Sequence, residues 1–596
     1  MSLTESVAVK GPPRGWTQVA AGAAALLAAL PLTLFLVLLR GHTGSVPEEQ
    51  VVARVVMALA AMFVVPVAGY LAWRRRAAEP AVLALVVLAT VVVLLLAIYL
   101  YSVESAVRFP ADILLWSEGD FVSDIVKFRL GHPIYGAPAD IESFTYTPGS
   151  QILTQAIARV VGAPDSIPAF RAIQLGYLAL ASLFATLACR RVLARATGET
   201  PIEHPLLWSA VWAVVLFLIG GNTVTSPFTH LLHNDALALL VCALGYYLLV
   251  EFVATGNAWL LLPMALLPGF GFLAKQSLAV WAGIYSLFLL VFERRLGWVR
   301  LGAFAVASFG SVALAVGACY LAWGQHFFYW TFQVMGNHHI SPLRSAQHVL
   351  DAWEYFAAGL VGGFLVLDWQ RFDRWTGLWL AALGLLAVEA YTSGIAWMLN
   401  HMGPGSMLCG IWLLAALTRS WSGLSAPRTG APLLVWARSA TALVAVLLAM
   451  SGLGLIRVPT PSLPDDAHRY MAEIEREFAG EPADQVLLDY GSWIYARNGV
   501  VMKDHAAPIG EAGFTGTADF SGMLARINTR FYRRILVRDY DSPEFTYDYM
   551  LWPRSSGIKA ALDANYVAVG KIAEVQGRGR NPPWFKTITV LEPRAK

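Results

Sequence analysis

Long apolar runs constrain the fold of this chain more than any other feature. A membrane-spanning helix needs about 20 consecutive, mostly apolar residues. Such runs cover 16–39, 51–73, 81–101, 170–188, 205–220, 235–253, 301–322 and 433–455, and shorter ones cover 258–274, 277–292, 352–368, 377–396 and 404–418. Because only 14% of the residues are charged and 57% are hydrophobic, the chain lacks the charge that covers a soluble protein. We expect a polytopic α-helical membrane protein with about 13 transmembrane helices.

The basic residues indicate how these helices are oriented. Clusters follow alternate spans, at Arg74–Arg76, Arg190–Arg195, Glu293–Arg300 and Arg371–Arg374, and near Arg419 and Arg428. Since Lys and Arg are retained in the cytoplasm, we expect the N-terminus to be cytoplasmic and the loop 102–169 to be extracytoplasmic. The Ala-, Arg- and Gly-rich composition is typical of a GC-rich bacterium, so we expect the chain to lie in the bacterial cell (inner) membrane. The net charge of +3 predicts no nucleic-acid partner.

The last part of the chain differs in composition. Charge rises, the long apolar runs stop, and prolines between 459 and 464 indicate a linker. The apolar spacing predicts an amphipathic helix over 465–479 and short buried strands over 485–490, 534–540, 566–572 and 587–591. We expect a soluble, extracytoplasmic α/β domain over 459–596, after additional N-terminal transmembrane helices over 1–80 and the main membrane domain over 81–458. The α/β domain shows no catalytic motif, so we expect it to guide an acceptor or cover an active site.

Acidic residues gather directly after an apolar run, in the segment "SEGDFVSD". Asp120 and Asp124 are four residues apart, so both lie on one face if the segment is helical. Together with Glu118 they are candidate catalytic groups. The alternative is structural: Asp120 caps the helix and Asp124 pairs with Lys127. The segments "GHPIYG" and "FTYTPGSQ" follow in a loop whose length favours a functional role.

Aromatic residues in this loop have two interpretations. Tyr135, Phe144 and Tyr146 form either an amphipathic surface at the lipid headgroups or simple interfacial anchors. Tyr135 and Tyr146 are therefore candidates for substrate binding.

Further polar residues mark the same side of the membrane. "HND", which is His233, Asn234 and Asp235, precedes an apolar run, and Asp235 is either a helix cap or a second site carboxylate. Lys275 and Gln276 lie between two short runs, where the lysine either extends to the interface or binds a lipid phosphate.

Two loop residues complete this candidate set. Arg344 is another cation on this side of the membrane, and His401 precedes a turn. We include both as candidate substrate-binding residues.

Taken in order, "EGD", "GHPIYG", "FTYTPG", "HND" and "AKQ" resemble the motifs of the GT-C superfamily of membrane glycosyltransferases over about 80–420. The similarity is to bacterial members akin to protein O-mannosyltransferases and the aminoarabinose transferases of lipid A. It implies a GT-C-like membrane domain and a polyprenyl-phosphate-linked sugar donor. It also implies an acidic catalytic residue at Asp120. The mannosyltransferase motif has adjacent Asp and Glu, so "EGD" leaves open whether Glu118 or Asp120 is the base.

The chemistry agrees with this resemblance. Inverting displacement needs a base beside an acceptor hydroxyl, and the departing lipid phosphate needs a cation or a metal. Lys275 and Arg344 suit the cationic role, and a divalent metal held by Asp120 and Asp235 is the alternative. The acceptor would be a glycan, lipid or protein beside the bilayer. Two other functions stay open: a transporter or flippase of lipid-linked substrates, and a membrane scaffold.

Overall fold

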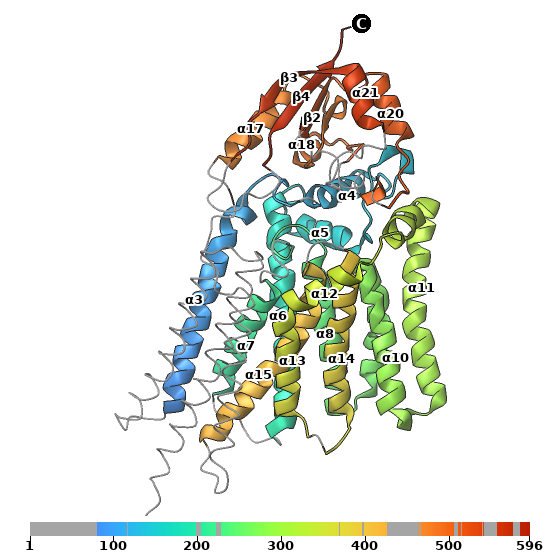
Figure 1. Ribbon diagram of the computed structural model, residues 1–596. Helices are drawn as coiled ribbons and strands as arrows, with labels where there is room; N and C mark the ends of the chain where they lie inside the picture. Colours follow the sequence, from blue (N-terminus) through green and yellow to red (C-terminus); the bar gives the residue numbers. More distant parts are fainter. Residues whose placement is uncertain are drawn as a thin grey trace, which may run out of the picture.

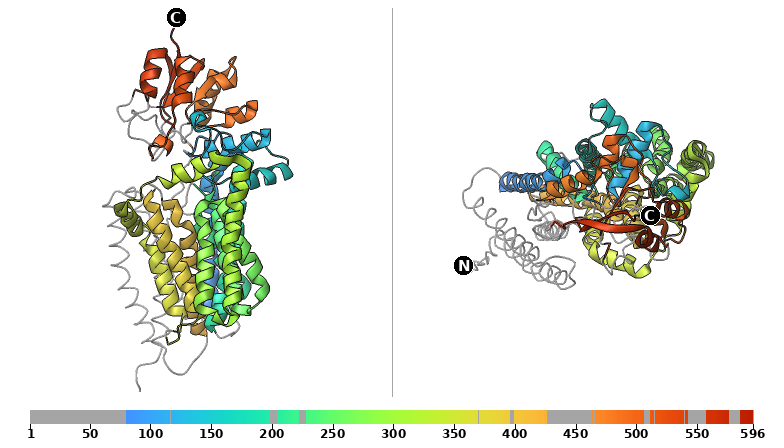
Figure 2. Two further views of the ribbon diagram at one scale, coloured as in Figure 1. Left: turned by 90° about the vertical axis from the view of Figure 1, so that its right-hand side faces the viewer. Right: turned by 90° about the horizontal axis from the view of Figure 1, so that it is seen from above.

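The computed structural model describes residues 80–115, 117–197, 204–221, 228–368, 370–395, 399–425, 463, 466–505, 511–513, 515–538, 540–541, 557–575 and 585–595. The apolar runs 16–39, 51–73 and 433–455 lie outside the described residues. Three layers follow one another along the molecule: a bundle of long helices, a layer of short helices and loops, and a sheet with its own helices (Figure 1). The side view in Figure 2 shows the same stacking.

The bundle contains a helix at every apolar run that lies within the described residues. Its helices are α3 (Pro80–Arg108), α6 (Ile167–Thr197), α7 (Pro205–Gly220), α8 (Asp235–Thr255), α9 (Leu261–Ala274), α10 (Val280–Phe292), α11 (Trp298–Phe328), α13 (Trp353–Val366), α14 (Arg374–Thr392) and α15 (Gly403–Ser425). Four described helices are long and apolar enough to cross a membrane, or five if the bent pair Pro342–Asp351 and Tyr355–Val366 forms one span. The larger number of spans stays a prediction.

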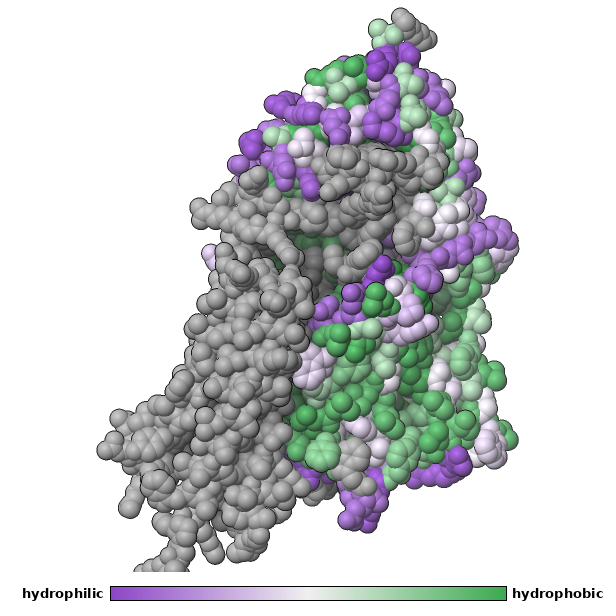
Figure 3. Space-filling model, in the orientation of Figure 1, coloured by the Kyte–Doolittle hydropathy of each residue, from purple (hydrophilic) through white to green (hydrophobic). Residues whose placement is uncertain are grey.

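Apolar packing holds this bundle together. Helices α6, α8, α13 and α15 bury a common core that includes Trp412 and Cys409, and α9 packs against α11. On the face shown in Figure 3, the described surface of the bundle is largely hydrophobic, and hydrophilic residues gather over the sheet layer and at the opposite end of the bundle. An apolar outer surface is unfavourable in water and favourable in lipid. The chain is thus a multi-pass membrane protein.

Charged residues form ion pairs at the end of the bundle that lies away from the sheet. The guanidinium of Arg195, at the end of α6, lies 3.5 Å from the carboxylate of Asp373, before α14. Arg374 lies 3.1 Å from Glu293, which follows α10. The basic clusters on these loops therefore gather at one end of the molecule, as the alternating pattern in the sequence requires.

A layer of short helices covers the opposite end of the bundle. It contains α4 (Glu118–Leu130), η1 (Pro138–Asp140) and α5 (Gly149–Val160). Helix α4 ends at Gly131, whose φ of 76° is a left-handed conformation that glycine adopts without steric cost. Helix α5 begins at Gly149, where a Cβ atom would lie 2.6 Å from the Leu273 carbonyl oxygen. This close approach sets α5 directly on the end of α9.

The four expected strands form one sheet. They are β1 (Val486–Leu488), β2 (Arg534–Arg538), β3 (Tyr566–Ile572) and β4 (Ile588–Pro593), in the order β1-β2-β4-β3. β1 is parallel to β2, with Val486 paired to Arg534, and the other two pairings are antiparallel. The accompanying helices are α17 (Ala467–Phe478), α18 (Trp493–Asn498), α20 (Ser521–Asn528) and α21 (Ile558–Asn565).

The sheet layer is fastened to the short-helix layer by polar contacts. Both oxygens of Asp112 accept backbone N–H groups at the start of α18, from Ser492 at 2.7 Å and Trp493 at 3.0 Å. The backbone N–H of His505 donates to the carbonyl of Ile141 at 2.9 Å. These bonds fix the loop before α18 and the segment around 505 directly over α4.

Candidate functional site

Glu118 is saturated by hydrogen bonds. Its carboxylate accepts two from the Arg171 guanidinium, at 2.7 and 2.6 Å, and one from the backbone N–H of Leu232 at 3.0 Å. Arg171 also donates to the carbonyls of Ala106, Phe109 and Ala111. Glu118 and Arg171 are fully buried. The pair therefore joins α4 to α6 and to the segment before α8.

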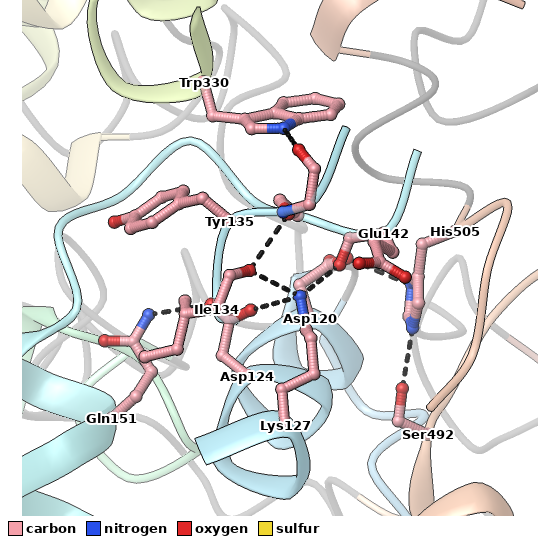
Figure 4. A network of polar contacts seen from close by, with 12 residues as sticks. Asp120, Asp124, Lys127, Ile134, Tyr135, Glu142, Gln151, Trp330, Ser492 and His505 are labelled. Carbon is pink, nitrogen blue, oxygen red and sulfur yellow. Dashed lines mark hydrogen bonds and ion pairs between the residues drawn. The ribbon is translucent and has the colours of Figure 1, made fainter. Parts of the chain in front are cut away.

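Asp120 has one engaged oxygen and one open oxygen. Its Oδ1 lies 3.0 Å from Nδ1 of His505, whose Nε2 lies 2.7 Å from Oγ of Ser492 (Figure 4). No described residue donates a hydrogen bond to Oδ2, although Asp120 is only 2% exposed. Burial raises the pKa of Asp120, and the adjacent His505 opposes this rise. The alternative in which Asp120 caps the helix is wrong, because the cap position of α4 is Ser117 and Asp120 lies inside the first turn.

Asp124 lies one turn further along α4. It forms the expected pair with Lys127 at 3.0 Å, and its Oδ2 accepts a hydrogen bond from Gln151 at 3.2 Å. Lys127 also donates to the carbonyls of Ile134, at 2.8 Å, and Glu142. Burial raises the pKa of Asp124 to about 6. Asp124 and Lys127 thus connect α4 to α5 and to the loop after α4.

Asp235 begins α8, and three polar side chains surround its carboxylate. Nδ1 of His233 lies 2.9 Å away, Asn400 donates at 2.7 Å, and the Lys275 ammonium forms an ion pair with it. Lys275 is only 5% exposed, so it is a buried cation with a buried counter-ion. The adjacent Asn234 makes no side-chain capping bond to the helix.

His401 lies beside this group, in the turn before α15. Burial, reinforced by the positive charge of Lys275, lowers the pKa of His401 to about 3. Its ring is therefore neutral near pH 7.

Contacts link the two carboxylate groups. The centroid of the His233 ring lies 4.9 Å from the ring centroid of Phe121, the residue after Asp120. It lies 5.5 Å from the ring centroid of Tyr146. Gln276, next to Lys275, donates to the carbonyl of Thr145 at 2.6 Å. The acidic motif, "HND" and "AKQ" therefore meet at one junction between the bundle and the short-helix layer.

The expected aromatic surface at the headgroups is wrong. Tyr135 and Phe144 are each 1% exposed, and Tyr146 is partly buried. The Tyr135 hydroxyl donates to the Tyr146 carbonyl at 2.6 Å, and Trp330 donates to the Gly136 carbonyl at 3.0 Å. These residues form the packed interior of the loop and attach it to the segment after α11.

Arg344 donates hydrogen bonds to backbone carbonyls. It lies in α12 (Pro342–Asp351), and its guanidinium donates to the carbonyls of Gly394 and Ile395, both at 3.3 Å. These bonds join α12 to the end of α14. The contacts described for Asp120 and Asp235 do not include Arg344.

A metal held by Asp120 and Asp235 does not fit the residues present. Within the described ranges, no three His, Cys, Asp or Glu side chains are grouped as metal ligands. The oxygens of Asp235 face the Lys275 ammonium, the Asn400 amide and His233. A second cation there would be repelled by the ammonium.

Three residues at this junction were not singled out from the sequence. Arg171 offered a weak signal, a single arginine near the start of an apolar run. Ser492 and His505 offered none, because each lies outside the motifs and more than 300 positions from Asp120. Only the placement of the sheet layer over α4 identifies them.

Comparison with solved structures finds ArnT from Cupriavidus metallidurans bound to undecaprenyl phosphate, at 13% identity and a TM-score of 0.45, covering 85% of this chain and 97% of that one. It also finds the Archaeoglobus fulgidus oligosaccharyltransferase in the apo form, at 13% identity and a TM-score of 0.44, covering 85% and 76%. No family model and no curated sequence matches this chain. Because these similarities are weak, its function has to be inferred from its own side chains.

Proposed function

We propose that this protein is a glycosyltransferase that moves a sugar from a polyprenyl-phosphate donor to an acceptor hydroxyl on the extracytoplasmic face. The observation that carries the proposal is the buried Asp120 carboxylate, which has one oxygen held by His505 and the other open. A general base needs an oxygen within about 2.6–3.2 Å of the acceptor proton, and Oδ2 of Asp120 has this capacity.

Asp120 suits the role of base better than its two acidic neighbours. All the donors around Glu118 belong to Arg171 and the Leu232 backbone, so its carboxylate serves the fold. Asp124 pairs with Lys127 and accepts from Gln151. Because both oxygens of Asp124 already have partners, an acceptor hydroxyl would have to displace Lys127 or Gln151 to reach this carboxylate.

The reaction is a single displacement. The acceptor oxygen forms a bond to the anomeric carbon while its proton passes to Oδ2 of Asp120. The bond between the anomeric carbon and the phosphate oxygen breaks, and the lipid phosphate departs with the electron pair. Attack from the side opposite the leaving group inverts the anomeric centre.

Lys275 is the proposed partner of the donor phosphate. An ammonium group has three N–H donors, and only one is directed at Asp235. Asp235 forms an ion pair with Lys275, and Asn400 and His233 contact the carboxylate of Asp235. The remaining N–H groups can stabilise charge on the departing phosphate.

The proposed orientation follows from the charged end of the bundle. The arginines that pair with Asp373 and Glu293 would lie in the cytoplasm, and the sheet layer outside. We propose that the protein lies in a bacterial cell membrane. The junction then lies at the outer headgroup level, where a lipid-linked sugar presents its anomeric carbon.

The test uses purified protein and a panel of polyprenyl-phosphate sugars with release of the lipid phosphate as readout. We expect release from one donor class that depends on an acceptor and is lost in Asp120→Asn. Asp484→Asn, the same change at an exposed position, is the control. If the protein moved a lipid-linked sugar across vesicles without cleaving it, it would be a transporter and the proposal would be wrong.

A further inference from the structure

We infer that His505 and Ser492, which belong to the sheet layer, are positioning residues that hold Asp120 ready to accept a proton. This role rests on the proposed function, in which Asp120 is the base. It gives the C-terminal part of the chain a direct share in the active site, in place of the guiding or covering role expected from its sequence.

The three side chains form a continuous chain of hydrogen-bonding groups. His505 lies between Asp120 and Ser492, with contact distances of 3.0 and 2.7 Å (Figure 4). Each residue is at most 3% exposed. Water therefore does not compete strongly for these contacts, and the geometry is set by the protein.

Backbone bonds hold both positioning residues from the side of the membrane domain. The His505 N–H donates to the Ile141 carbonyl at 2.9 Å, and the preceding Asp504 N–H donates to that of Asp140 at 3.1 Å. The Ser492 N–H donates to Asp112 at 2.7 Å. The segments before and after α4, the helix that contains Asp120, therefore hold the two residues that position Asp120.

The ionised state of Asp120 determines the tautomer of His505. An ionised carboxylate only accepts hydrogen bonds, so Nδ1 of His505 carries the proton and donates to Oδ1. Nε2 is then an acceptor and receives the Ser492 hydroxyl. This contact at Oδ1 restrains rotation of the carboxylate and leaves Oδ2 available for the acceptor hydroxyl.

An Asp, His and Ser chain also resembles the arrangement of a serine nucleophile, which is the competing interpretation. That chemistry needs free N–H donors beside the serine to stabilise an oxyanion. Here the N–H groups of Ser492 and Trp493 both donate to Asp112. The serine is therefore assigned to positioning His505.

The arrangement also affects the pH dependence. Charged or titratable groups close to Asp120 are Asp124 and Lys127 on α4, and Tyr490 and His505 in the sheet layer. His505 lowers the pKa of Asp120 against the effect of burial. Transfer is lost as pH falls through this pKa, so removing His505 should move the acid limb of the pH–rate profile to higher pH.

The test compares His505→Leu, His505→Asn and Ser492→Ala in the full-length protein. His505→Leu removes the donor, whereas the amide of His505→Asn can still donate to Asp120. We expect His505→Leu to lower kcat by about 10- to 100-fold, with little change in KM for the donor and an acid limb at higher pH. His505→Asn should recover much of the loss, and Ser492→Ala should lose less.

A double-mutant cycle separates positioning from general damage. If His505 acts through Asp120, adding His505→Leu to Asp120→Asn should cause no further loss. Equal losses in the Leu and Asn variants, with the acid limb unchanged, would instead assign His505 to structure. Full activity in His505→Leu would overturn the inference and leave the proposed function intact. Absence of transfer by the unchanged protein would overturn the proposed function itself.

Discussion

Asp120 and Asp235 are both buried carboxylates at the junction, and their surroundings differ. Asp235 faces an ammonium, an amide and an imidazole, so its negative charge is compensated within the protein. Among the residues that the structure describes, His505 alone contacts the Asp120 carboxylate, and one oxygen is open. Partners that compensate the charge of a carboxylate hold it in place, whereas an unoccupied carboxylate oxygen can receive a proton. The comparison assigns Asp235 to anchoring Lys275 and Asp120 to the chemistry.

The largest expected effect separates these two residues directly. Asp120→Asn preserves shape and removes basicity, so kcat should fall by about 10²- to 10⁴-fold without loss of folding. Asp235→Asn should lower activity less and raise KM for the donor, because Lys275 loses its counter-ion. Steady-state kinetics on both variants tests the assignment, and a larger kcat loss in Asp235→Asn would reverse it.

A second substitution tests the difference between Glu118 and Asp120 in "EGD". Glu118→Gln leaves the buried Arg171 without its ion pair, which should lower the free energy of unfolding by about 3–5 kcal/mol. Thermal unfolding in detergent measures this loss. The folded fraction should retain transfer activity. A stable Glu118→Gln variant without activity would make Glu118 the base.

Lys275 tests the proposed role of the Asp235 group. Lys275→Ala should raise KM for the donor and lower kcat by about 10²-fold, since a donor to the leaving phosphate is lost. The double variant with Asp235→Asn should recover stability, because it removes the unpaired carboxylate, but not activity. Recovery of activity in the double variant would show that the lysine only balances Asp235.

The pH dependence offers a smaller effect with a defined sign. Burial raises the pKa of Asp120, so the acid limb of transfer should lie above the usual range for aspartate. Asp124→Asn removes a nearby negative charge and should move the limb to lower pH, opposite to His505→Leu. A pH–rate profile for each variant checks the directions. Shifts in the same direction would contradict the assignment of Asp120 as the titrating base.

The orientation can be tested without activity. A reporter active only outside the cytoplasm should be active when it follows Lys596 and silent when it follows Gly297, at the charged end. The reverse result would place the junction on the cytoplasmic face and remove the proposed donor from reach.

The sequence by itself determined elements of the helix bundle and of the sheet layer. The run 205–220 became α7 with the same bounds, and 566–572 became β3. These elements follow local rules, because an apolar run long enough to span lipid has few alternatives to a helix, and short alternating or apolar runs between turns favour strands. The sequence also identified the polar motifs that meet at the junction.

Only the tertiary structure decided what each polar residue does there. Glu118 and Asp120 are two residues apart and chemically alike, yet one is closed by Arg171 and the other is left open beside His505. Tyr135 is buried because the loop folds over it. Such differences depend on partners supplied by distant segments. Side-chain type and local spacing carry no information about those partners, since burial and hydrogen bonding are fixed only when the layers pack.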